Sequence, residues 1–171
     1  MRIRTGGPAD APATLALLDA AVAWLVSLGR TGQWGDRPWT SHRKAVERTE
    51  RYARDYLLRV AEDADGRALG VCVLAEEAPE YATPVDRPEL YVRLLVTDRA
   101  HRGSGIGAAL VADAVEETRR RGLGLLRVDC YAGDDRRLVA QYEKLGFTPT
   151  ESFEVDQSGT PWPGQLLEIR L

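Results

Sequence analysis

The sequence predicts a single domain of the α+β class, in a mixed α/β order, over residues 1–171. A chain of 171 residues can bury a substantial core without help from a metal or a disulfide. Apolar residues recur at helical spacing in some stretches and alternate in shorter ones, which indicates that helices and strands are both present. The expected order, β-α-α-β-β-β-α-β-α-β-β, combines hairpins with one helical crossover and therefore argues against a regular βαβ repeat.

The first half of the chain predicts a strand, two helices and a hairpin. Asp10 and Pro12 suit the start of a helix whose apolar stripe ends at Gly29. The dipeptide Asp65-Gly66 is a strong hairpin signal between two apolar runs. The elements are expected as a strand over 1–5, helices over 11–28 and 42–54, and hairpin strands over 56–63 and 67–76.

The second half predicts strands that alternate with two helices. Residues 89–97 alternate in polarity as a strand does, and a helix with arginines near its end follows the glycines. Asp134 or Asp135 can cap a further helix, which Gly146 ends. The elements are expected as a strand over 89–97, a helix over 104–121, a strand over 125–132, a helix over 135–145, and strands over 147–155 and 165–171.

Composition excludes several classes of partner. The formal net charge of −3 gives no electrostatic reason to expect nucleic acid. The longest apolar stretch, residues 11–28, is interrupted by polar residues, so we expect neither a membrane span nor a signal peptide. Cys72 and Cys130 lie in apolar runs without metal-ligand spacing. We therefore expect buried thiols, no metal and a cytoplasmic protein.

The stretch HRGSGIGAAL, which begins at His101, suits a bound phosphate. Successive glycines let backbone N–H groups turn toward one point, and the following helix adds its dipole. A P-loop is excluded because Ala108 and Ala109, not Lys-Ser/Thr, follow Gly107. The dinucleotide fingerprint is matched by Gly103, Gly105 and Ala108, but the stretch TDRAHR intervenes, so the first glycine is not in a tight turn directly after the strand. A nicotinamide-dependent oxidoreductase therefore stays a weaker alternative.

From Arg102 the chain reads R-G-S-G-I-G, and residues 141–147 read QYEKLGF. In this order and separation, the two segments resemble the R/Q-x-x-G-x-G/A signature and the late Y-E-K-x-G-F segment of the GNAT superfamily of acetyl-CoA-dependent N-acetyltransferases. The resemblance is sharp over residues 90–155 and rests on element order over 1–88. It implies the GNAT acyl-CoA N-acyltransferase fold, a mostly antiparallel twisted sheet of about seven strands with about four helices. It also implies a homodimer, which is frequent in the family.

The resemblance implies a binding site for acetyl-CoA. Leu95 and Val96 would pair through their main chain with the pantetheine arm, and an amide near Leu95 would polarise the thioester carbonyl. Asp135 stands where many members have an asparagine that contacts the pantetheine, and an ionised aspartate cannot donate a hydrogen bond. The pyrophosphate would lie on the main-chain amides of the signature, which comprises Arg102, Gly103, Ser104, Gly105, Ile106, Gly107 and Ala108.

Two residues are candidates for proton transfer. Tyr142 matches the family's tyrosine, which is placed to protonate the departing thiolate, although its spacing with Leu138 and Leu145 also fits a buried helix aromatic. Glu89, at the start of the strand before the signature, is the first candidate for the base, with Glu76 and Glu77 behind it. Solvated loop carboxylates would explain these acids equally well.

The acceptor implied by the resemblance is a primary amine of a small molecule or a peptide, acetylated by direct transfer in a ternary complex. Five acidic residues between Glu76 and Glu89 suggest a mouth that attracts cations. Trp34, Trp39 and Trp162 fall in loops where the family builds its acceptor wall, although tryptophans also pin long loops to a core. A non-catalytic acyl-CoA-binding domain of the same fold is the main alternative.

Overall fold

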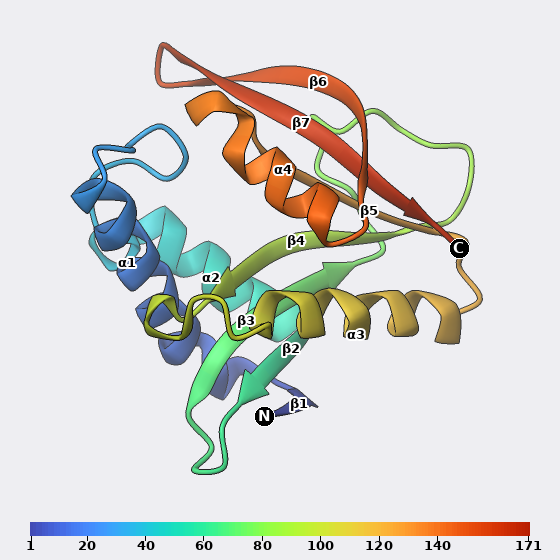
Figure 1. The fold of residues 1–171 in the computed structure, drawn as a ribbon, viewed down its shortest axis with the longest axis horizontal. Coiled ribbons are helices and arrows are strands. Elements are labelled where there is room, and N and C mark those ends of the chain that lie inside the picture. The colour runs from blue at the N-terminus through green and yellow to red at the C-terminus, as the bar shows by residue number, and fades with distance from the viewer.

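Seven strands form one sheet in the computed structural model, which describes residues 1–171 (Figure 1). The strand order is β1-β2-β3-β4-β5-β7-β6, and only the β4/β5 pair is parallel. This arrangement, together with four helices, confirms the predicted α+β class. The strands are β1 (Arg2–Thr5), β2 (Leu57–Glu62), β3 (Ala68–Ala75), β4 (Leu90–Thr97), β5 (Leu125–Tyr131), β6 (Thr148–Gln157) and β7 (Thr160–Arg170). The helices are α1 (Ala11–Ser27), α2 (Arg43–Asp55), α3 (Ile106–Arg120) and α4 (Arg137–Lys144).

Helices cover both faces of the sheet because buried strands carry apolar side chains on alternate sides. Val71 and Val73 of β3 pack with α1 and α2, whereas Cys72 and Leu74 of the same strand pack with α3 and α4. Figure 1 shows α3 and α4 in front of the sheet and α2 behind it. The same sheet therefore supports two separate apolar cores.

The stretch Pro8–Ser27, which contains α1, is long and apolar enough, with a mean hydropathy of 1.4, to meet the length and composition of a membrane span. In this fold α1 contacts β3, β4 and α2. Eight of its residues are buried, including Leu18 and Val22. The apolar character of the helix is thus used in the core of the domain.

The centre of the sheet opens between β4 and β5. These strands pair only from Leu90↔Leu126 to Val92↔Val128. The register of β4 against β3 shifts at this point, so that Arg93 is the extra residue of a β-bulge. Beyond the bulge β4 continues beside β3, while β5 continues beside β7. The strands part, and an opening is left between them.

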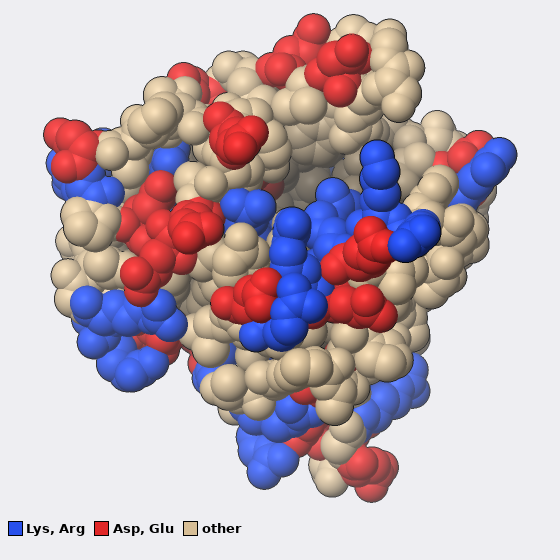
Figure 2. All heavy atoms as spheres, turned by 180° about the vertical axis from the view of Figure 1, so that it is seen from behind, with Lys and Arg blue, Asp and Glu red and all other residues tan.

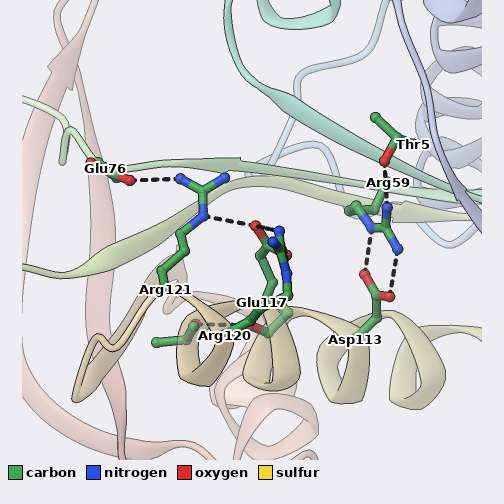
Figure 3. A network of polar contacts seen from close by, with 9 residues as sticks. Thr5, Arg59, Glu76, Asp113, Glu117, Arg120 and Arg121 are labelled. Carbon is green, nitrogen blue, oxygen red and sulfur yellow. Dashed lines mark hydrogen bonds and ion pairs between the residues drawn. The ribbon is translucent and has the colours of Figure 1, made fainter.

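Ion pairs hold α3 against the sheet (Figure 3). Arg59 on β2 donates to Asp113 over 2.7 and 2.8 Å and to the Thr5 hydroxyl over 2.6 Å. At the C-terminal end of the helix, Arg121 donates to Glu117 over 2.7 Å and to Glu76 over 2.6 Å. These contacts fix the direction of α3, whose first residues lie beside the β4/β5 opening.

The last strand departs from the prediction, because β7 begins at Thr160 and not at Gln165. Trp162 therefore lies within β7, opposite Val155 of β6, and not in a loop. The prolines at 161 and 163 favour a loop by sequence because proline lacks an N–H. They are accommodated because the paired stretch between β7 and β5 ends at Gly164, so this part of β7 has only β6 as a neighbour strand.

Candidate active site

The glycine-rich turn before α3 presents free backbone amides. Gly103 and Gly105 adopt φ values of +81° and +82°, a region that strains residues with a side chain. The first turn of α3 is closed by Ala109, whose N–H donates to the Gly105 carbonyl over 2.9 Å. The N–H groups of residues 106–108 therefore lack helix partners, as expected at a helix start. With the helix dipole, they form a cradle for an anion.

Arg99 adds an uncompensated positive charge beside this cradle. Its guanidinium carbon lies 3.7 Å from the ring centroid of Trp24, and that of Arg102 lies 5.7 Å from the same ring. The Arg99 Nε is buried and has no hydrogen-bond partner. Burial and the neighbouring charge of Arg102 lower the pKa of Arg99. An orphaned buried donor beside free amides fits a ligand with phosphate oxygens.

A first cavity of about 190 Å³ runs from this cradle into the β4/β5 opening. Leu95, Val96 and Gly107 line it, as the sequence analysis expects, together with Tyr142. Asp134 lines it and Asp135 does not, so the structure does not place Asp135 where the resemblance puts it. Arg102, Gly103 and Ser104 form the exposed turn outside this lining. Three arginines line the cavity, namely Arg30, Arg99 and Arg137.

A second cavity of about 550 Å³ lies on the opposite side of the opening and is rich in aromatic residues. It contains the three predicted tryptophans, Trp34, Trp39 and Trp162, and the rings of the first two lie 5.7 Å apart. The Trp162 indole donates to the Gln33 carbonyl over 3.1 Å and so ties β7 to the α1–α2 loop. Figure 2 shows a hollow in the face opposite to that of Figure 1, with basic side chains gathered along one side of it.

The two cavities meet around Tyr142 of α4. Tyr142 is only 8% exposed, and burial raises the pKa of its hydroxyl well above the usual value. The hydroxyl therefore stays protonated over the physiological pH range. The residues shared by both linings are Gln33, Trp34, Leu95, Tyr131, Leu138 and Tyr142. A ligand in the first cavity can therefore meet a ligand in the second beside a proton donor.

Glu89 is not brought into this site. Its carboxylate accepts hydrogen bonds from Nε and Nη2 of Arg127, and it lines neither cavity. Glu76 is bound to Arg121, and neither Glu76 nor Glu77 lines a cavity. A carboxylate in a buried ion pair away from the cleft is poorly placed to take a proton from an acceptor. This geometry disfavours the predicted role of Glu89.

The predicted acidic mouth is also absent from the cavity walls. The 76–89 segment contributes Pro79 and Tyr81 to the second cavity, but none of its acids. The one carboxylate in that lining is Asp129 of β5, and the cations are Lys44, Arg48 and Arg93.

The sequence alone did not reveal Asp129 and Arg93 as residues of this cavity. They lie 36 positions apart and come together only through the pairing of β4 with β5. The sequence did not reveal Trp24 and Arg99 of the first cavity either. The two arginines of the stretch RAHR, residues 99–102, could have indicated an anion site there.

Comparison with known proteins identifies the family. A sequence model described as the acetyltransferase (GNAT) family matches residues 16–147. The chain belongs to this family. Among GNAT relatives, a mycothiol acetyltransferase of Nocardia farcinica is 34% identical over 148 residues, which are 84% of this chain and 43% of that protein. An L-methionine sulfoximine/L-methionine sulfone acetyltransferase of Pseudomonas aeruginosa is 27% identical over 146 residues, which are 85% of this chain and 78% of that protein.

The chain spans less than half the length of the mycothiol acetyltransferases that it matches. Solved structures agree with the GNAT fold. A ribosomal-protein-alanine N-acetyltransferase from Brucella melitensis matches with a TM-score of 0.67 at 21% identity, over 100% of both chains. YncA from Salmonella typhimurium, solved with its cofactor acetyl-CoA, matches with a TM-score of 0.65 at 19% identity, over 99% of this chain and 92% of that one. The predicted fold is confirmed, and a Rossmann sheet is excluded by the mostly antiparallel strand order.

Proposed function

We propose that this chain is an N-acetyltransferase that moves the acetyl group of acetyl-CoA directly to a primary amine. The observation that carries the proposal is the meeting of two cavities at Tyr142, one lined by arginines and free amides and the other by aromatic residues. Bringing both reactants to one point in the same complex supplies much of the catalysis of such a transfer.

The chain's own residues account for the binding of the donor. The amides of residues 106–108 and the unpartnered Arg99 Nε suit the diphosphate, and Arg30 and Arg137 offer further cations. Beyond the bulge, β4 has no strand partner on its β5 side, so the main chain at Leu95 and Val96 is free to pair with the pantetheine arm. When bound, acetyl-CoA supplies an activated acetyl thioester. Tyr142 holds the proton that the thiolate leaving group requires.

Titration calorimetry with acetyl-CoA and thiol release with a panel of amines test the proposal. The panel contains L-methionine sulfone, L-phenylalanine, 2-phenylethylamine and a peptide with a free N-terminus. We expect binding of acetyl-CoA, and release of free thiol that depends on one class of amine. Binding without turnover on a broad amine panel would instead support the non-catalytic acyl-CoA-binding alternative. Absence of binding would contradict both.

The predicted compartment and assembly belong to the same proposal. Both cysteines are free and buried, which is consistent with a reducing cytoplasm. Burial raises the pKa of Cys72 and of Cys130 to about 12, so neither thiol is reactive at neutral pH. The proposal of a homodimer rests only on the frequency of dimers in the family. Sedimentation analysis of the purified chain measures its oligomeric state directly.

A further inference from the structure

Arg93 and Asp129 flank the point where β4 and β5 part. They are the residues that directly follow the last shared pair, Val92↔Val128, and they are close enough for the charge of Arg93 to lower the pKa of Asp129. Tyr91 of β4, two residues before Arg93, contacts Asp129 through its hydroxyl. Arg93 and Asp129 both line the second cavity, where the acceptor is proposed to bind.

The Asp129 carboxylate accepts hydrogen bonds from tyrosine hydroxyls but has no ion-pair partner. Its Oδ1 accepts a hydrogen bond from the Tyr91 hydroxyl over 2.5 Å, and its two oxygens lie 3.3 and 3.2 Å from the Tyr81 hydroxyl. No arginine or lysine forms an ion pair with it. Burial raises the pKa of Asp129, while the two tyrosine hydrogen bonds and the charge of Arg93 oppose this rise. A partly buried carboxylate on a cavity wall is a site for a ligand cation.

Arg93 offers the complementary charge. Its Nη1 donates to the Glu77 carbonyl over 3.1 Å, and its guanidinium carbon lies 5.8 and 5.7 Å from the ring centroids of Tyr52 and Tyr56. Guanidinium has five N–H donors, so several stay available, and no carboxylate is bound to it. With Lys44 and Arg48, the lining has three cations against one carboxylate. This balance favours an acceptor that carries an anionic group beside its amine.

We propose that Asp129 and Arg93 together bind an acceptor with a primary amine next to a carboxylate, as in an amino acid. Its ammonium lies on Asp129, which takes the first proton, and its carboxylate lies on Arg93. This inference rests on the proposed acetyltransferase function and names the acceptor class of that same site.

The proton balance of the transfer gives each group one role. The ammonium passes one proton to Asp129, and the freed lone pair forms the N–C bond to the acetyl carbon as the C–S bond breaks. The sulfur receives a proton from Tyr142, and the second amine proton restores the Tyr142 hydroxyl. Asp129 then releases its proton to solvent, so one proton leaves per amide formed, as the overall reaction requires.

The pH dependence of the site depends on the titratable and charged groups near Asp129. They are Tyr81, Tyr91 and Arg93, the neighbouring thiol of Cys130, and Tyr142 of α4. Burial raises the pKa of each of these tyrosines and of Cys130, and the pKa of Arg93 is also raised. The tyrosines, the Cys130 thiol and Arg93 therefore keep their protons at neutral pH, and Asp129 is the one carboxyl among them. His42 lines the same cavity, so the pH profile of a His42→Gln variant is measured beside that of the wild type.

The test compares matched acceptors with the intact chain. The pairs are L-phenylalanine with 2-phenylethylamine, and L-methionine sulfone with 3-(methylsulfonyl)propylamine, which differ only by the carboxylate. We expect the amino acid of at least one pair to have the higher kcat/KM. Arg93→Gln is expected to lower kcat/KM for that amino acid about 10- to 100-fold and to leave its decarboxylated partner within about threefold.

Asp129→Asn is expected to lower kcat/KM about 100-fold or more for every amine. In the wild type, log kcat/KM should level off above the pKa of Asp129, whereas in the variant it should keep rising toward the pKa of the amine. Glu154→Gln, an exposed carboxylate on β6, is the control. Acetyl-CoA binding and the melting temperature of each variant show that the fold and the donor site are intact.

The outcomes separate this inference from the function on which it rests. Three results would overturn the inference while acetyl-CoA binding stands. They are an equal kcat/KM for both members of each pair, turnover of only the two amines that lack a carboxylate, and turnover of none of the four compounds. An Asp129→Asn variant with the wild-type rate and pH profile also overturns it. A wild-type chain that does not bind acetyl-CoA refutes the proposed function itself, and the inference falls with it.

Discussion

Arg127 on β5 and Glu89, the residue before β4, form a buried ion pair with side chains only 4% and 8% exposed. Nη2 of Arg127 donates to Glu89 over 2.8 Å, Nε donates to the other carboxylate oxygen, and Nη1 donates to the Thr83 carbonyl over 2.8 Å. The guanidinium carbon lies 5.6 Å from the ring centroid of Tyr91, whose hydroxyl binds Asp129. The pair therefore supports one wall of the second cavity without lining it.

Loss of Glu89 should affect stability more than chemistry. Glu89→Gln leaves the buried Arg127 charge without its counter-ion, and we expect a cost of about 3–5 kcal/mol in the free energy of unfolding. Denaturant unfolding measures this, and the double variant Glu89→Leu/Arg127→Met should recover much of the loss. Below the unfolding midpoint, kcat/KM should stay within a few-fold of the wild type. A hundredfold loss in well-folded Glu89→Gln would instead assign the base to Glu89.

Tyr142→Phe should separate donor binding from turnover. The hydroxyl is the group at the meeting point of the cavities, whereas the ring packs against Phe147 with centroids 5.6 Å apart and stays in place. We expect kcat to fall about 100-fold and the calorimetric affinity for acetyl-CoA to change less than threefold. Unchanged turnover would reduce Tyr142 to a core aromatic.

Gly105→Ala tests the anion cradle, and Gly122→Ala is its control because it introduces the same kind of backbone strain elsewhere. Gly105 and Gly122 have φ values of +82° and +69°, and an added Cβ at either position meets no atom within 4 Å. Both substitutions should cost about 1 kcal/mol of stability. Only Gly105→Ala, next to the free amides, should weaken acetyl-CoA binding, by about tenfold or more in calorimetry. Equal binding by the two variants would remove the cradle from the site.

Arg99→Gln should weaken acetyl-CoA binding and reduce its dependence on salt. The unpartnered Nε gains a partner only when an anion is bound, so its removal costs about 10- to 100-fold in Kd. Arg119→Gln is the control, because Arg119 is exposed on α3 and pairs only with Glu116. Titration at two ionic strengths gives both quantities, and identical curves for the two variants would argue against a phosphate contact at Arg99.

Asp10 gives a stability test with a defined pH dependence. Its hydrogen bonds from Arg4, at 2.7 and 3.1 Å, lower its pKa below the ordinary 3.8. A lowered pKa stabilises the fold above pH 3.8, and this contribution is lost as the pH falls through the folded-state value. The wild type should melt a few degrees above Asp10→Asn at pH 7, and the gap should close as the pH falls through the folded-state pKa of Asp10. Asp36→Asn, at an exposed position, should show no such gap.

The order and type of the elements could be predicted because each depends on local signals. The αL glycines before α3, the turn at Asp65-Gly66 and the two apolar helix stripes are legible without tertiary information. The donor half of the site follows from the same local residues, since the turn and the helix start are contiguous in the chain.

The lining of the second cavity could not be predicted in this way. It depends on which strands are neighbours and on where their pairing ends. Neither can be deduced from the positions of Arg93 and Asp129 in the sequence. Glu89 was chosen by its place on a strand, but its partner Arg127 comes from the adjacent strand 38 positions away. Trp162 was placed in a loop because the effect of its flanking prolines depends on which edge of β7 is unpaired.

The hydrogen bond from Trp162 to the Gln33 carbonyl joins the last hairpin to the segment between the first two helices, and both residues line the second cavity. One bond thus ties together two parts of the cavity wall that lie 129 positions apart in the chain. The hairpin and the α1–α2 segment cannot move apart without losing it.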